Sequence, residues 1–100
     1  MNAGILFDRA KLGELCRRHH IRRLAFFGSV LRGDFRPDSD VDVLVDFEPD
    51  EVVGLRFIRI ERELSDLLGG RKVDLLTPKS LNRRIRDRVL ADAEVQYAEG

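Results

Sequence analysis

The pattern of apolar and polar residues predicts three strands along the chain. The clearest is Val41–Phe47, where every second residue is apolar, so these side chains share one face and two aspartates lie on the other. Leu24–Phe27 is a short apolar run that ends at the Gly28-Ser29 turn. Lys72–Leu76 is a third run of strand-forming residues. These strands are expected to form one small sheet.

Apolar residues spaced three and four positions apart predict helices around these strands. The first helix spans Asp8–Arg18, with Asp8 as its N-cap. Its buried face would be formed by Leu12, Leu15 and Cys16. The second helix spans Gly54–Leu68 and stops at the glycine pair Gly69-Gly70. Both helices have an apolar side that can cover one face of the sheet.

A last helix begins at Thr77-Pro78, since proline suits the first turn of a helix. Its buried stripe would be formed by Leu81, Ile85 and Val89. The tail from Tyr97 is expected to fray. This order of elements predicts an α/β (α+β) fold, a small mixed sheet packed against helices, as a single domain over residues 1–100.

Composition narrows the possible classes of function. Of 100 residues, 43% are hydrophobic and 36% are charged, which is typical of a soluble globular domain. The 18 basic and 18 acidic residues cancel, so a general polyanion binder is not expected and nucleic acid is an unlikely direct partner. The lone Cys16 excludes an internal disulfide and a cysteine zinc site, which favours a reducing compartment, the cytoplasm. No apolar run is long enough to span a membrane.

The charges are unevenly distributed along the chain. Residues 34–51 hold eight acids and one base, whereas basic residues gather at Arg17–Arg23 and Lys79–Arg88. An acidic patch beside basic ones can hold divalent cations together with a polyanionic ligand, but both patches can equally be solvated surface. The last helix carries several arginines, which either meet an acidic partner or form a solvated face. They are Arg83, Arg84, Arg86 and Arg88.

Two aspartates at the entry to the central strand are candidate metal ligands. Asp40 and Asp42 are two residues apart, so their side chains leave the same face, about 7 Å apart from the rise of a strand. Carboxylates at this spacing can share Mg²⁺ or Mn²⁺. Asp46 lies on the same face but roughly 13 Å beyond Asp42, too far to join them. The pair is weak evidence alone, because such pairs also occur at ordinary strand ends.

Gly28-Ser29 and Asp74 add to this candidate site. A glycine and a free N–H group after a buried strand favour phosphate binding, although a plain turn with a serine N-cap has the same sequence. Asp74 lies within an apolar strand, where a carboxylate needs a partner or a metal unless it points to solvent from an edge strand. If the second and third strands are neighbours, Asp74 can face Asp40 and Asp42. Three carboxylates and a phosphate-binding turn are the parts that two-metal phosphoryl or nucleotidyl transfer requires.

The segment from Gly28 to Val45 resembles the signature of the nucleotidyltransferase superfamily that includes DNA polymerase β. It is most similar to the minimal nucleotidyltransferases, with Gly-Ser, Arg-Gly and Ser-Asp-x-Asp followed by an apolar strand. The resemblance covers essentially the whole chain, including the strand that carries Asp74 and the last helix. It therefore implies a nucleotidyltransferase fold.

The resemblance also implies roles for individual residues. Gly28 and Ser29 would bind the β- and γ-phosphates of ATP. Asp40 and Asp42 would bind two Mg²⁺ ions, with Mn²⁺ as an alternative, and Asp74 would complete the site and help to activate the acceptor hydroxyl. Arg32 would contact a phosphate or form a structural salt bridge.

The minimal members of this family imply a partner. They are usually paired with a small helical HEPN-domain toxin, and some neutralise it by transferring AMP from ATP to a toxin tyrosine. Two hypotheses therefore stand: a Mg²⁺-dependent protein adenylyltransferase, and a non-catalytic antitoxin that blocks its partner by contact. Transfer to a small molecule or RNA is a further possibility, and self-association is compatible with the sequence. The sequence predicts no strand face rich in aromatic residues for base stacking, since Trp is absent and Tyr97 is the only tyrosine, and this argues against a stand-alone polymerase.

Overall fold

The computed structural model describes residues 7–28, 40–49 and 52–99. Its elements follow one another as α1 (Arg9–Arg18), β1 (Ile21–Phe27), β2 (Val41–Phe47), α2 (Arg56–Leu67), β3 (Val73–Leu76), the 3₁₀ helix η2 (Pro78–Ser80), α3 (Arg83–Asp92) and β4 (Glu94–Ala98). In this part of the chain the sheet has four strands in the order β3-β2-β1-β4. β1 is antiparallel to β2 and to β4, whereas β3 is parallel to β2. The predicted mixed sheet with helices is confirmed.

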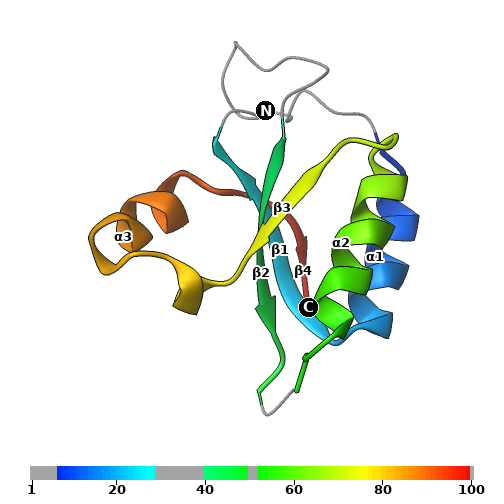
Figure 1. Ribbon diagram of the computed structural model, residues 1–100, viewed down its shortest axis with the longest axis horizontal. Coiled ribbons are helices and arrows are strands. Elements are labelled where there is room, and N and C mark those ends of the chain that lie inside the picture. Colours follow the sequence, from blue (N-terminus) through cyan, green and yellow to red (C-terminus); the bar gives the residue numbers. More distant parts are fainter. Residues whose placement is uncertain (1–6, 29–39, 50–51, 100) are drawn as a thin grey trace.

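The two faces of the sheet are covered differently. α1 and α2 lie side by side on one face, and α3 stands on the other (Figure 1). The alternating residues of β2 that face α1 and α2 are completely buried; they are Val41, Val43 and Val45. They pack with Ile60 and Leu64 of α2 in one apolar cluster. Since side chains alternate along a strand, Asp42 lies on the α3 side of the sheet.

The first helix forms as its sequence predicts. The Oδ1 atom of Asp8 accepts hydrogen bonds from the backbone N–H groups of Ala10 (2.9 Å) and Lys11 (3.2 Å), which caps α1. The apolar face is buried as expected, including Leu12, Leu15 and Cys16. The chain then turns at His20, with φ of 58°, and β1 begins at Ile21, three residues before the predicted strand.

The C-terminal region differs from the prediction in two ways. The last helix does not run on from Thr77-Pro78: η2 closes after Ser80, and a separate α3 begins where the side chain of Asn82 accepts a hydrogen bond from Arg84 N (2.8 Å). No residue of α3 is buried, and Ile85, expected in a buried stripe, is 46% exposed. Leu81, which precedes α3, is buried as predicted.

The tail does not fray at Tyr97 as expected. Residues 94–98 form β4, and Tyr97 pairs with Leu24 of β1. Tyr97 is partly buried against the central apolar cluster. The prediction failed because this strand is short and depends on the free edge of β1, which is a tertiary feature.

No helix in the described part of the chain is both long enough and apolar enough to span a membrane.

Candidate functional site

Asp42 and Asp74 are aligned on neighbouring strands. They are direct partners in the parallel register of β2 and β3. Adjacent strands lie about 4.8 Å apart, and paired residues present their side chains to the same face. The second and third strands are neighbours, which meets the condition under which Asp74 can face the acids of β2. In the described sheet β3 is an edge strand, and Asp74 is exposed to solvent, as the alternative interpretation of this residue predicts. This exposure does not conflict with a position beside Asp42.

Gly28 lies against the other side of Asp42. Phe27, the last residue of β1, pairs with Asp42 across the antiparallel register, and Gly28 follows with φ of +75°. A Cβ atom at position 28 would collide with Oδ2 of Asp42. Glycine is therefore required here both for its backbone conformation and for the space beside the carboxylate. The sequence suggested a turn at Gly28, but nothing local in it indicated this contact.

Asp40 immediately precedes β2 and is exposed. Between it and Asp42 lies Val41, which is completely buried and whose N–H donates to the carbonyl of Lys72 (2.8 Å). This hydrogen bond holds the start of β2 beside the start of β3, so Asp40, Asp42 and Asp74 all lie near the same end of the sheet. Ser29 and Arg32, the other predicted site residues, lie outside the described residues, and their roles stay predictions.

The side chains around Asp42 and Asp74 can supply only some of the ligands that a metal ion needs. Among the residues that the structure describes, no group of three or more His, Cys, Asp or Glu side chains could hold a metal. Asp42 and Asp74 offer two aligned carboxylates, and Mg²⁺ is commonly bound by one or two carboxylates with substrate phosphates supplying further oxygens. The donor set thus fits Mg²⁺ together with a nucleotide, rather than a cage made by the protein alone.

Asp46 has a structural role, in agreement with its predicted distance from the other acids. Its Oδ2 forms an ion pair with the Nη2 of Arg22 (2.7 Å), and this contact joins β1 to β2. The ion pair and its hydrogen bond raise the pKa of Arg22 above its ordinary value. Asp46 therefore offers a natural control for Asp42, on the same strand and the same face.

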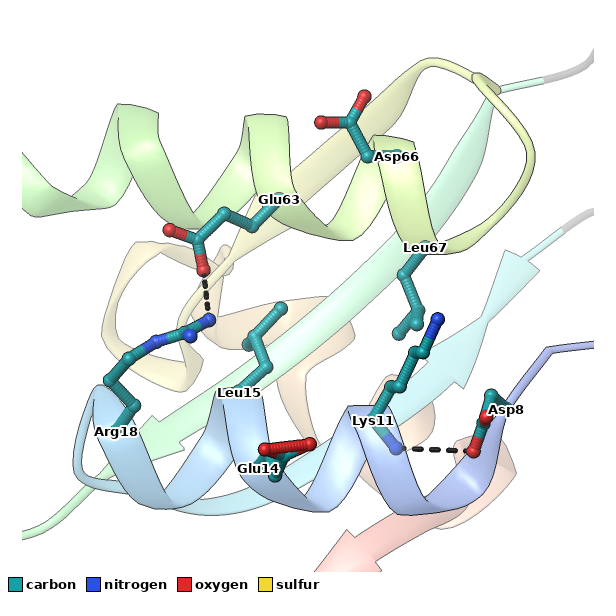
Figure 2. Close-up of a pocket in the computed structure, with 8 residues that line it drawn as sticks. All are labelled: Asp8, Lys11, Glu14, Leu15, Arg18, Glu63, Asp66 and Leu67. Atoms are coloured by element: carbon teal, nitrogen blue, oxygen red, sulfur yellow. Dashed lines mark hydrogen bonds and ion pairs between the residues drawn. The ribbon is translucent and has the colours of Figure 1, made fainter.

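A groove of about 490 Å³ lies between α1 and α2 (Figure 2). These two helices cover the face of the sheet opposite to Asp42. At one end the Nη2 of Arg18 contacts the Oε1 of Glu63 (2.6 Å), which also lies 3.0 Å from the Nε2 of buried His19. Burial disfavours the charged form of Glu63, but the hydrogen bonds and charges of His19 and Arg18 outweigh it and lower the pKa of Glu63. These contacts join the two helices. His19, which follows α1 directly, contacts Glu63 of α2, a partner that no local pattern in the sequence indicated.

Comparison with known proteins places these features in a family. The model of the nucleotidyltransferase domain family matches residues 9–95. The protein adenylyltransferase MntA of Thermococcus cleftensis is 46% identical over 80 residues, which cover 79% of this chain and 78% of that protein.

Solved structures share the fold. One described as a minimal nucleotidyltransferase superposes with a TM-score of 0.71 at 41% identity, covering 85% of each chain. Another contains the tri-AMPylated HEPN toxin of Shewanella oneidensis in complex with an MNT antitoxin. It superposes with a TM-score of 0.63 at 19% identity, over 91% of this chain and 70% of that chain.

Proposed function

Since this chain belongs to the nucleotidyltransferase domain family, we propose that it transfers AMP from ATP to a tyrosine hydroxyl of a partner HEPN-domain toxin and thereby acts as an antitoxin. The relative named protein adenylyltransferase supports the reaction, and the AMPylated toxin complex with the same fold supports the partner. The observation that carries the proposal is the alignment of Asp42 with Asp74, with the backbone of Gly28 against Asp42.

The predicted site residues bind two different groups, the phosphates of ATP and the metal ion. Gly28 and Ser29 bind the β- and γ-phosphates through backbone N–H groups and the serine hydroxyl, and Arg32 adds a cation to the triphosphate. Asp42 and Asp74 are the aligned carboxylates that would hold Mg²⁺ together with the nucleotide phosphates, and Asp40, at the entry to β2, would join them once the metal is bound; Mn²⁺ can substitute. When bound, the metal stabilises the charge of the triphosphate and lowers the pKa of the attacking hydroxyl. Because Gly28 touches Asp42, the phosphates and the metal ligands are held at a fixed distance from each other.

The acceptor reaches the site from the edge of the sheet. Asp74 is exposed on the edge strand β3, so a hydroxyl on the surface of another protein can approach it without a change in the fold. The hydroxyl oxygen forms a bond to the α-phosphorus of ATP, the bond from this phosphorus to the bridging oxygen breaks, and pyrophosphate leaves. Asp74 accepts the proton of the hydroxyl.

A non-catalytic antitoxin is the second candidate function. The observation that favours it is that the described residues gather no group of three metal-binding side chains. In this case the chain neutralises its partner by contact, and the acids at the strand ends take no part.

One pair of variants separates these functions. Asp42→Asn removes a carboxylate from the site, whereas Asp46→Asn removes one from the same face of the same strand and breaks only a surface ion pair. Transfer predicts that Asp42→Asn still binds the toxin but no longer protects cells from it, while Asp46→Asn binds and protects like the wild type. If Asp42→Asn binds and protects fully, the contact antitoxin is correct.

A further inference from the structure

The surface of α3 is incompletely covered by the rest of the chain. The partly buried residues are spaced three and four apart, which places them on the side of the helix towards the sheet; they are Arg86, Val89 and Ala93. The opposite side carries Arg84 and Arg88, one turn apart and exposed, with Ile85 beside them at 46% exposure. We call these three residues, Arg84, Ile85 and Arg88, the α3 face. It combines two cations with an apolar side chain that the fold leaves half in solvent.

The charge of this surface is positive and uncompensated. α3 holds four arginines and two aspartates, a formal charge of +2. The ion pairs among the described residues involve α1, β1, β2, α2 and the turns beside them, and none involves a residue of α3. Arg86 differs from the α3 face, because its Nε is buried and its Nη2 donates to the carbonyl of Leu81 (3.4 Å). Arg83, Arg84 and Arg88 are therefore the exposed cations of α3 that a partner can neutralise at little cost to the fold, and Arg84 and Arg88 are the two that lie together on the α3 face.

The position of α3 relates it to the acceptor side of the candidate site. Val41, Val43 and Val45 point towards α1 and α2, so Asp42 and the aligned Asp74 lie on the face of the sheet where α3 stands (Figure 1). The chain passes from Asp74 through η2 directly into α3. In the described part of the chain β3 is the edge strand of the sheet, so a protein that brings a hydroxyl to Asp74 from this edge meets the α3 side of the molecule.

We propose that the α3 face is the docking surface for the acceptor protein, which meets it with an acidic surface and so positions its hydroxyl at Asp74. This inference rests on the proposed function and names the part of the chain that selects the partner. Two arginines beside an exposed isoleucine suit a protein interface, where arginine and apolar side chains supply much of the binding energy. Acidic groups on the acceptor complement Arg84 and Arg88 and steer its approach.

Two other occupants are less consistent with this surface. A nucleic acid would bring phosphates towards Asp87 and Asp92 of the same helix and towards the acids of the site, and the whole chain has no net positive charge. A second copy of the chain would place like charges against each other if two α3 faces met around a two-fold axis. An acidic protein surface avoids the second conflict, and its separate carboxylates, unlike a continuous phosphate backbone, can lie opposite Arg84 and Arg88 and away from Asp87 and Asp92.

The test compares two pairs of charge reversals on different helices. Arg84→Glu/Arg88→Glu changes the α3 face, and Arg59→Glu/Arg62→Glu changes two exposed arginines of α2 on the other side of the sheet. Glutamate favours helix formation, and at position 84 it also suits the first turn of α3, so the fold is expected to persist. Ile85→Ser and Ile58→Ser form a second pair, since Ile58 of α2 is 56% exposed.

The measurements use the HEPN-domain protein that co-purifies with the chain. Its Kd is measured by titration, and AMP transfer is measured against its concentration with Mg²⁺ and ATP. We expect Arg84→Glu/Arg88→Glu to weaken binding by about tenfold or more and to raise KM for the acceptor, while kcat at saturating acceptor stays close to wild type. Ile85→Ser acts in the same direction, whereas the α2 variants and the affinity for ATP stay unchanged.

Several results would overturn this docking surface. Equal binding by the α3 and α2 reversals would place the interface elsewhere. Loss of a homo-oligomer in the α3 variants, with unchanged acceptor binding, would assign the face to a second copy. Binding of the wild-type chain to a single-stranded oligonucleotide that the α3 reversal abolishes would assign it to nucleic acid. If the α3 reversal weakens binding but even the wild type transfers no AMP, the docking surface stands and the proposed enzymatic function fails.

Discussion

Replacing Gly28 with alanine is expected to damage AMP transfer far more than it damages the fold. Gly28 has φ of +75°, a conformation that costs an L-residue about 1–2 kcal/mol. The added Cβ would also collide with Oδ2 of Asp42 and come within 3.2 Å of its Cγ. The carboxylate is the end of a side chain, so it can rotate away. The backbone strain at position 28 therefore determines how much stability is lost, and the displacement of the Asp42 carboxylate determines how much activity is lost.

The expected magnitudes differ by enough to be separated. A loss of about 1–2 kcal/mol leaves a domain folded if its stability lies in the ordinary range of about 5–15 kcal/mol. In contrast, a displacement of about 1 Å in a catalytic group can reduce the rate on the order of 100-fold. Gly28→Ala should therefore unfold at a slightly lower urea concentration and transfer AMP about two orders of magnitude more slowly.

Gly69→Ala is the matched control. Gly69 has φ of +80°, and a Cβ there would meet nothing within 4 Å. Both variants should lose similar stability in urea unfolding, but only Gly28→Ala should lose transfer in a single-turnover assay with Mg²⁺ and ATP. If Gly28→Ala is folded and transfers AMP as fast as Gly69→Ala, the contact between position 28 and Asp42 does not position the site.

Further predictions concern parts of the fold away from the acids. Tyr97→Ala should reduce the free energy of unfolding by about 2 kcal/mol, because Tyr97 packs on the apolar cluster; an unchanged urea midpoint would mean that the tail is frayed after all. Burial raises the pKa of the Cys16 thiol to about 12, with only partial opposition from Arg17, so a thiol reagent at pH 8 should label Cys16 only after denaturant is added. The pKa of Glu63 is lowered on folding, so its contacts stabilise the protein at pH values above 4.5, the ordinary pKa of a glutamate. This stabilisation is lost as the pH falls through the lowered pKa of the folded state. Glu63→Gln should therefore lower Tm at pH 7, and thermal melts should show this difference shrinking below pH 4.5.

Local signals in the sequence were sufficient for the elements that depend on local chemistry. Asp8 was predicted as the cap of α1 because its side chain serves N–H groups only two and three residues away. Val41–Phe47 was predicted because strict alternation of apolar and polar residues is typical of a strand with one buried face. The same signals placed Asp42 on the opposite side from the core, which is where the structure has it.

The remaining features depend on contacts between distant parts of the chain. The register that aligns Asp42 with Asp74 is set by the packing of two parallel strands that are separated in the sequence by the whole of α2. β4 forms because it can pair with the edge of β1 that β2 leaves free. The short sequence of β4 alternates only weakly between apolar and polar residues, so it does not predict this pairing. Likewise, Ile85 has the spacing of a core residue, but Asn82 starts α3 as a separate helix on the more open face of the sheet.

The most direct test of the central claim is the intact mass of the HEPN-domain protein that co-purifies with this chain, before and after Mg²⁺ and ATP are added. The account predicts a gain of one or more adenylyl groups on that protein, and no gain with the Asp40→Asn/Asp42→Asn variant. A stable complex whose mass does not change with any of the four nucleotides would contradict the enzymatic account and leave a contact antitoxin.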